Sequence, residues 1–162
     1  MAQALAPVSR SEVLAMDKQQ DFVTFIVGGQ MFGIPVLKVQ DILKPEKIAT
    51  IPLAPPAVKG SINLRGRIVT VIDVRTRLGL KPRDDGKLDD NMAVTVENGQ
   101  DLYTLLVDTI GDVVSLSADL YENNPSTLDA RWREFSEGVY RLSDRLLVVL
   151  DVERMLDMKA KI

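Results

Sequence analysis

The sequence contains no cysteine and no histidine among its 162 residues. Without them the chain has no disulfide, thiolate nucleophile, imidazole base or zinc site built from the usual ligands. Carboxylates, lysine, serine and tyrosine can still take part in catalysis, so an enzyme is disfavoured rather than excluded. The acidic pairs Asp84-Asp85 and Asp89-Asp90 are better explained as part of a solvated loop. We therefore predict a protein that is not an enzyme and that has no catalytic residues, metal or cofactor.

Long apolar runs, positive charge and aromatic rings are also scarce. No segment approaches the eighteen or so apolar residues that a membrane-spanning helix needs, and the N-terminus lacks a basic region followed by an apolar core. These features predict a cytoplasmic protein that does not insert into the membrane. The net charge of −3 and the aromatic content of 5% disfavour the main rival interpretation, a small β-barrel module that stacks nucleic-acid bases over a basic groove.

The remaining composition fits one globular domain. Hydrophobic residues make up 46% of the chain and charged residues 27%, which is typical of a folded protein in water. A chain of 162 residues can bury one sizeable core but is too short for two ordinary domains. Residues 1–20 show no hydrophobic periodicity, so we expect a mobile N-terminal tail followed by one domain over residues 21–158.

Apolar and β-branched runs separated by turn residues predict an all-β chain built from hairpins. Gly28-Gly29 and Asn98-Gly99 are typical of tight hairpin turns, and residues 65–67 mark a third turn. The predicted strands therefore lie at residues 22–27 and 31–36, on both sides of the turn at 65–67 within 58–73, at 92–97 and 102–107, and within a last hairpin at 141–149.

Shorter elements fill the connections. Asp73 is expected to cap a short helix that Gly79 ends, and Asp151 is expected to cap a terminal helix marked by Val152, Met155 and Leu156. The two carboxylates are therefore assigned to capping and not to a catalytic pair. The other expected elements are a helix or helical turn over residues 36–42, a short edge strand over 48–53, a solvated loop over 81–91, and a short turn over 108–114.

The two halves of the chain resemble each other. Setting Gly60 against Gly138 aligns them without a gap, and a second, weaker correspondence sets Val23 against Val94. Each half is too small to form a stable sheet alone, so two small intertwined barrels that pack together are expected. The identical pairs at the first offset include Leu64/Leu142, Arg67/Arg145, Val71/Val149, Asp73/Asp151, Val74/Val152 and Leu78/Leu156.

Four blocks of sequence resemble the CheW family in their order and spacing. The most specific is KGSINLRGRIVTVIDVR, residues 59–75, in which an Asn-Leu-Arg-Gly turn is followed by Val-Ile-Asp-Val-Arg. The other blocks are VLKVQDIL (36–43), VDTIGDVVSLSADL (107–120) and EGVYRLSDRLLVVLDVERML (137–156). The resemblance implies an all-β fold of two five-stranded SH3-like barrels forming one CheW-like domain, with a hydrophobic seam between the barrels and short helices including a C-terminal one.

The resemblance also implies the function. Members of the family lack catalytic activity and bind two partners, namely the cytoplasmic hairpin tips of chemoreceptors and the regulatory domain of the CheA histidine kinase. A cytoplasmic adaptor at membrane-associated receptor arrays is therefore expected, monomeric alone and binding no nucleic acid. Thr70 stands where the family commonly has proline, and Arg141-Leu142-Ser143 replaces smaller residues, so a paralogue serving a pilus-type or developmental system remains open.

The resemblance assigns a receptor-facing surface. We expect a receptor helix to lie in an apolar groove at the seam between the barrels, with a polar rim that fixes its register. The duplication pairs Val39 and Ile42 with Ile110 and Val113, which would give matching apolar walls. The expected receptor-binding residues are Val39, Asp41, Ile42, Arg65, Tyr103, Ile110 and Val113.

The kinase-facing surface has a weaker signal in the sequence, because it would pair one barrel with a homologous barrel through ordinary strands and loops. Its expected position is the proline-flanked apolar segment that follows the first hairpin. The candidate kinase-binding residues are Ile48, Ile51, Leu53 and Val58. A second, weaker kinase contact, which closes rings of receptor and kinase, is expected over residues 117–124.

Overall fold

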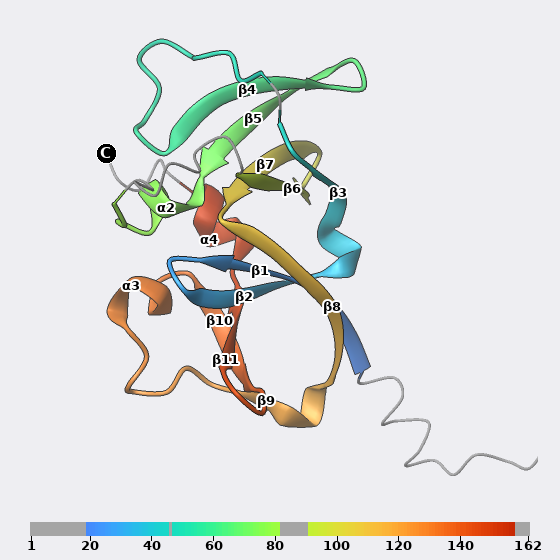
Figure 1. Cartoon of the computed structure of the whole chain (residues 1–162), viewed down its shortest axis with the longest axis vertical. Coiled ribbons are helices and arrows are strands. Elements are labelled where there is room, and N and C mark those ends of the chain that lie inside the picture. Colours follow the sequence, from blue (N-terminus) through green and yellow to red (C-terminus); the bar gives the residue numbers. More distant parts are fainter. Residues whose placement is uncertain (1–18, 46, 82–90, 158–162) are drawn as a thin grey trace, which may run out of the picture.

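The computed structural model describes residues 19–45, 47–81 and 91–157. These residues form two β-sheets joined by short helices, which confirms the predicted all-β fold (Figure 1). The first strand begins at Gln19, three residues before the predicted strand start and two before the predicted domain start at residue 21. The rest of the predicted tail, residues 1–18, and most of the predicted loop at 81–91 lie outside the described residues.

The larger sheet has six strands in the order β8-β1-β2-β11-β10-β9. The resemblance implied five, and the sixth is the two-residue strand β9, which pairs with β10 through Glu122 and Tyr121. The bounds are β1 Gln19–Val27, β2 Gln30–Pro35, β8 Thr109–Ser117, β9 Tyr121–Glu122, β10 Ser136–Arg141 and β11 Leu146–Leu150.

The smaller sheet has five strands in the order β3-β6-β7-β5-β4. The bounds are β3 Val39–Leu43, β4 Val58–Leu64, β5 Arg67–Asp73, β6 Met92–Asn98 and β7 Asp101–Val107. Short helices connect the strands: the 3₁₀ helices η2 (Val36–Lys38) and η4 (Ala118–Leu120), and the α-helices α2 (Val74–Arg77), α3 (Ala130–Arg133) and α4 (Val152–Leu156).

Each sheet combines strands from both halves of the chain. The hairpin β1-β2 pairs with β11 in parallel, and the hairpin β6-β7 pairs with β5 in the same way. The offsets found in the sequence reproduce the register, because Val149 lies opposite Gly33 and its counterpart Val71 lies opposite Thr104. Thus the halves exchange hairpins, and the two sheets have equivalent strand orders apart from β9.

Two connections differ from prediction. The expected helix over residues 36–42 is wrong beyond the single 3₁₀ turn η2, since residues 39–43 form β3, which pairs with β6. The expected turn over residues 108–114 is wrong too, because β8 is a nine-residue strand paired with β1. In both places the apolar spacing fits a helix and a strand, and pairing with a distant strand decides between them.

The predicted helix caps are confirmed, and the proline-rich segment is less regular than expected. The side chains of Asp73 and Asp151 accept hydrogen bonds of 3.0 Å from the backbone N–H groups of Arg75 and Arg154. The expected strand over residues 48–53 is reduced to one bridge, in which Ala49 pairs with Ser61 of β4. Neighbouring prolines limit the hydrogen bonds that this segment can donate.

The core consists of three clusters. The largest contains residues of both sheets, such as Phe25 and Phe32 from one and Val94 and Leu105 from the other. Two smaller clusters each belong to a single sheet, one around Val71 and the other around Phe22. Alternate side chains on the central strands therefore point either into one barrel or into the space between the barrels. The seam is filled by packed core.

Two arginines on α2 hold the sheets together. Arg75 makes a bidentate pair with Asp108, with N–O distances of 2.8 and 2.7 Å, and Asp108 also accepts from the Gly28 backbone at 2.9 Å. Arg77 donates to the carbonyl groups of Met155 and Asp157 at the end of α4. These bonds join the helix that follows β5 to the β1-β2 turn and to α4.

Candidate functional site

Arg65 lies at the tip of the β4-β5 hairpin in a strained conformation. Arg65 and Gly66 form the turn, with φ angles of 52° and 86°. A left-handed backbone costs about 1 kcal/mol or more for a residue other than glycine. The Asn63 side-chain oxygen accepts a 2.9 Å hydrogen bond from the Gly66 N–H, which fixes the turn. The turn thereby presents the arginine to solvent, and its side chain is 75% exposed.

Asp41 on β3 is the partner of Arg65. Its Oδ2 lies 3.0 Å from the Arg65 guanidinium, and its Oδ1 accepts a 2.9 Å bond from the Ile42 N–H. Strands β3 and β4 are the two edges of the smaller sheet, so this ion pair links the hairpin tip to the opposite edge. An exposed pair contributes about 0–1 kcal/mol to folding. The Arg65 guanidinium is exposed and can therefore also bond to a partner protein.

Three of the apolar receptor-facing residues lie at the border of the inter-sheet core. Val39 lies opposite Val96, which in turn lies opposite Tyr103, giving one row across three strands. Val39, Tyr103 and Ile110 are each partly buried and pack against the inter-sheet cluster. Core side chains fill the interior of the seam, so a receptor groove at the seam can lie only along its rim, where these three residues are partly accessible.

Ile42 and Val113 differ from these three residues. Their side chains are 41% and 59% exposed, and neither belongs to a core cluster of the described chain. The two positions are equivalent in the duplication, since Ile42 lies opposite Val94 and Val113 lies opposite the counterpart residue Val23. The structure thus brings Asp41 to Arg65 and brings Val39, Tyr103 and Ile110 to one cluster, and it leaves Ile42 and Val113 on the surface.

The four kinase-facing candidates also divide into two kinds. Ile48 packs against the cluster of the smaller sheet, and Val58 packs against the inter-sheet cluster. Between them Ile51 is exposed, and Leu53 is fully exposed with a left-handed φ of 62°. A large apolar side chain in such a backbone conformation is unfavourable for folding alone.

The neighbouring backbone holds this segment in place. Gly60 has a φ of 153°, and a Cβ at this position would collide with the carbonyl oxygen of Ala49. The absence of a side chain permits the Ala49 N–H to donate to Ser61 O at 2.8 Å, and the Ser61 N–H to donate to Ala49 O at the same distance. The exposed segment therefore starts from a fixed point on β4.

Sequence reasoning missed some polar and exposed apolar groups. The pair of Arg75 with Asp108 joins residues far apart in the chain, and no motif marked it. Leu37 is 90% exposed, and no sequence pattern singled it out. At the offset of the weaker correspondence Leu37 is the counterpart of Asp108. An apolar residue matched with an acidic one indicates that the two positions have different surroundings.

The described residues contain neither a metal-binding cluster nor a helix that could cross a membrane. No group of three or more acidic residues is placed to hold a metal ion within residues 19–45, 47–81 and 91–157. Over the same ranges, the helices are all too short or too polar to cross a membrane.

Comparison with known proteins gives consistent matches over most of the chain. The family model described as CheW-like domain matches residues 21–160. A protein named Chemotaxis protein CheW from Klebsiella aerogenes is 34% identical over 138 residues, covering 85% of this chain and 81% of the relative. Protein PilI from Pseudomonas aeruginosa is 27% identical over 126 residues, covering 78% of this chain and 70% of PilI.

A solved structure has the same fold. The crystal structure of the scaffolding protein TtCheW from Thermoanaerobacter tengcongensis superimposes with a TM-score of 0.76 at 28% sequence identity. The match covers 86% of this chain and 93% of that chain.

Proposed function

Because the chain belongs to the CheW family, with the domain model covering residues 21–160, we propose that it couples the cytoplasmic tips of chemoreceptors to the regulatory domain of the CheA histidine kinase. It is a non-enzymatic chemotaxis scaffold. Residues 21–158 act as one domain that is monomeric alone. In the cell it joins receptor and kinase arrays beneath the membrane.

The observation that carries the proposal is the ion pair of Arg65 with Asp41. It links the two segments that match the receptor-facing part of the family. Arg65 makes this pair from a left-handed backbone conformation, which lowers the stability of the fold. An arginine that is 75% exposed can form bidentate bonds to a carboxylate or bond the carbonyl groups at a helix end. Bonds to the receptor would compensate for the free-energy cost of this turn conformation.

An apolar strip accompanies this pair. Ile42 and Val113 offer exposed side chains, and Val39, Tyr103 and Ile110 form the half-buried rim behind them. A receptor helix lying along this rim would bury the exposed residues against its own apolar face, while Asp41 and Arg65 set its register. The binding surface is therefore a shallow strip along the seam.

The kinase contact is proposed for the segment between Ile48 and Val58. The partly buried residues Ile48 and Val58 at its ends anchor the backbone, and the exposed Ile51 and Leu53 lie between them. Burying a fully exposed leucine against a partner is worth about 1.5–3 kcal/mol, which suits an anchor residue at an interface.

A pull-down with purified proteins tests both contacts. Immobilised receptor signalling tips and the CheA regulatory domain should each retain the chain, Arg65→Ala should reduce retention by the receptor tips alone, and Leu53→Ser should reduce retention by the kinase domain alone. Failure of both partners to retain the wild-type chain would refute the proposal. Salt-sensitive binding to an oligonucleotide in the same assay would favour the nucleic-acid module instead.

A further inference from the structure

An elongated trough runs over one end of the larger sheet. A cavity of about 330 Å³ opens between η2 and β10, and a neighbouring cavity of about 430 Å³ shares Gln20, Pro35 and Leu37 with it. We call the two together the tyrosine trough. The residues that define it here are Gln20, Pro35, Leu37, Tyr121, Glu137 and Tyr140. Tyr121 lies within residues 117–124, where a second kinase contact is expected, and the other five lie outside the expected receptor and kinase surfaces.

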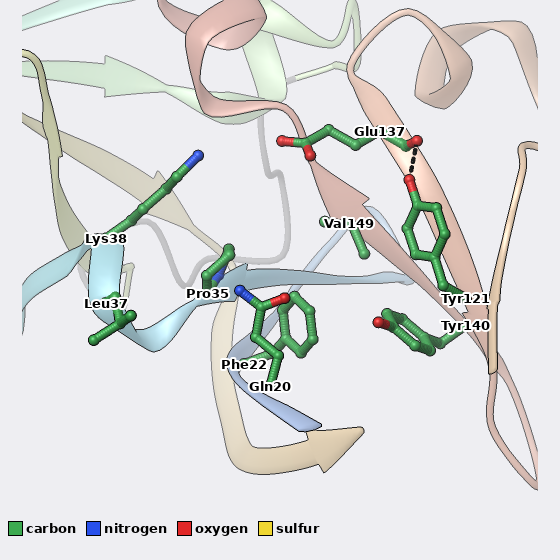
Figure 2. A pocket seen from close by; sticks show the side chains of 9 residues that line it. All are labelled: Gln20, Phe22, Pro35, Leu37, Lys38, Tyr121, Glu137, Tyr140 and Val149. Carbon is green, nitrogen blue, oxygen red and sulfur yellow. Dashed lines mark hydrogen bonds between the residues drawn. The ribbon is translucent and has the colours of Figure 1, made fainter. Parts of the chain in front are cut away.

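Tyr140 offers an unused hydrogen bond inside the trough. The residue is only 3% exposed, with its ring packed against Phe22 and Tyr121 at centroid distances of 5.5 and 5.6 Å. Its hydroxyl points into the cavity (Figure 2) and has no hydrogen-bond partner within the described part of the chain. Burial raises the pKa of Tyr140, so this hydroxyl remains a donor at neutral pH. No side-chain polar atom of the described residues is both fully buried and without a partner, so this hydroxyl is open to the cavity and can donate to water or to a ligand.

Glu137 adds a carboxylate to the same cavity. Burial raises the pKa of Glu137, although Lys38 across the opening acts in the opposite direction (Figure 2). The Tyr121 hydroxyl donates to the Glu137 backbone carbonyl, which fixes the position of this part of β10. The Glu137 carboxylate points across the opening toward Lys38, away from the two tyrosine rings (Figure 2), and a carboxylate in this place can pair with a cationic side chain.

The charge and shape of the trough restrict its occupant. Asp21 and Glu137 outnumber Lys38 among its charged residues, so the lining has a net negative charge. Leu37 is 90% exposed beside Pro35, giving an apolar surface along the second cavity. Two adjoining cavities that share three lining residues offer room for a segment of chain that passes from one to the other. Extended segments present free carbonyl groups to aromatic-lined grooves.

We propose that the tyrosine trough binds an extended segment of a partner protein, in which a basic side chain pairs with Glu137 and a backbone carbonyl accepts from Tyr140. Apolar residues of the segment, proline among them, pack on Pro35 and Leu37. This binding surface is separate from the strip around Arg65, so a failure of one leaves the other unaffected.

Selection of peptides on the intact protein tests the proposal. A phage-displayed library of random 12-residue peptides is selected on the immobilised full chain, and the affinities of the recovered peptides are then measured by fluorescence polarisation. We expect peptides that combine a basic residue with proline or apolar residues. Their affinity should fall about tenfold for Glu137→Gln and several-fold for Tyr140→Phe, as the loss of a charge-assisted and a neutral hydrogen bond implies. Arg65→Ala, outside the trough, should bind them like the wild type.

The variants are chosen to remain folded. Glutamine has the shape of glutamate, and the Tyr140 hydroxyl has no partner within the described residues to lose, so both variants should unfold at the wild-type temperature. If either unfolds earlier, Leu37→Ser takes its place, because this exposed side chain contributes little to folding.

Three results would overturn the proposal. One is a selection that recovers no peptide, or only peptides without a basic residue. Another is undiminished affinity in the trough variants. The third is a monomer–dimer equilibrium in sedimentation that Glu137→Gln abolishes, since that would assign the trough to a second copy of this chain.

Discussion

The hairpin β4-β5 and its counterpart β10-β11 have the same place in their sheets but different turns. The first has the two-residue turn Arg65-Gly66, with positive φ angles and an ion pair to Asp41. The second turn is longer and is closed by a 2.8 Å bond from the Leu142 N–H to Arg145 O. Ser143 stands where the first hairpin has Arg65. The duplication thus accounts for the scaffold, and departures from it indicate where partners bind.

The same difference separates the two edge strands. Asp41 on β3 uses its side chain to hold Arg65. Its counterpart Asp112 on β8 accepts a 2.6 Å bond from the Thr24 hydroxyl through its backbone carbonyl. Thr24 is buried, so this second bond stabilises the fold, whereas the exposed ion pair contributes little to stability. We therefore expect mutations in the two halves to have different consequences.

The largest effect is expected at the equivalent glycines Gly60 and Gly138. A Cβ at Gly60 would meet the backbone oxygen of Ala49, whereas at Gly138 it would meet the side chain of Tyr121, which can move. Gly60→Ala should therefore lower the free energy of unfolding by about 2–3 kcal/mol, and Gly138→Ala by about 1 kcal/mol. Urea unfolding measures both. Equal losses of unfolding free energy would contradict this prediction, because they would mean that the Ala49 backbone moves aside as easily as the Tyr121 side chain.

The second effect concerns the bond network that occurs in only one half. Asp108→Asn weakens the pair with Arg75 in a partly buried position, so unfolding should become easier by about 2 kcal/mol. Asp144→Asn is the matched control, because its pair with Arg145 is exposed and has an N–O distance of 3.6 Å. Thermal unfolding measures both variants, and the control should have the unfolding temperature of the wild type. A similar loss in the control would show that charge, not this contact, determines stability.

The third effect is on binding. Arg65→Ala should weaken the affinity for receptor tips about tenfold, because a desolvated charge-assisted bond contributes roughly 1.5–3 kcal/mol. Its unfolding temperature should stay within about a degree of the wild type. Arg145→Ala in the other hairpin removes the same charge and should leave receptor affinity unchanged. Isothermal titration would contradict the assignment if both variants bound alike.

The smallest effect concerns the strain of the first turn. Arg65→Gly removes the side chain and relieves the left-handed conformation, so stability should rise by about 0.5–1 kcal/mol over Arg65→Ala while receptor binding stays equally weak. Urea unfolding of the two variants measures the difference. Equal stabilities would show that the turn holds no strain.

The sequence was sufficient for the hairpins, the helix caps and the family. Turn residues such as Gly28-Gly29 act locally, and so do the capping carboxylates of Asp73 and Asp151, so their effects can be read from neighbours in the chain. The strands β3 and β8 could not be recognised, because their pairing partners lie far away in sequence. A hydrophobic seam was expected from the duplication, but the residues that fill it could not be listed, because they depend on which face each strand presents.

In the candidate site, too, some features follow from neighbouring residues in the sequence and others only from the folded chain. Arg65 was identified from a local turn motif, and its partner Asp41 from a neighbouring motif, but their contact required the closed sheet. The tyrosine trough has no local signature at all. Its residues come from β1, β2 and η2 and, far from these in the chain, from β9 and β10.

Receptor-dependent autophosphorylation of CheA, measured with and without this chain, tests the central claim most directly. The account predicts that receptors stimulate the kinase only when the chain is present, that Arg145→Ala supports full stimulation, and that Arg65→Ala does not. Equal kinase activity with and without the chain at saturating concentrations of receptor and kinase would contradict it.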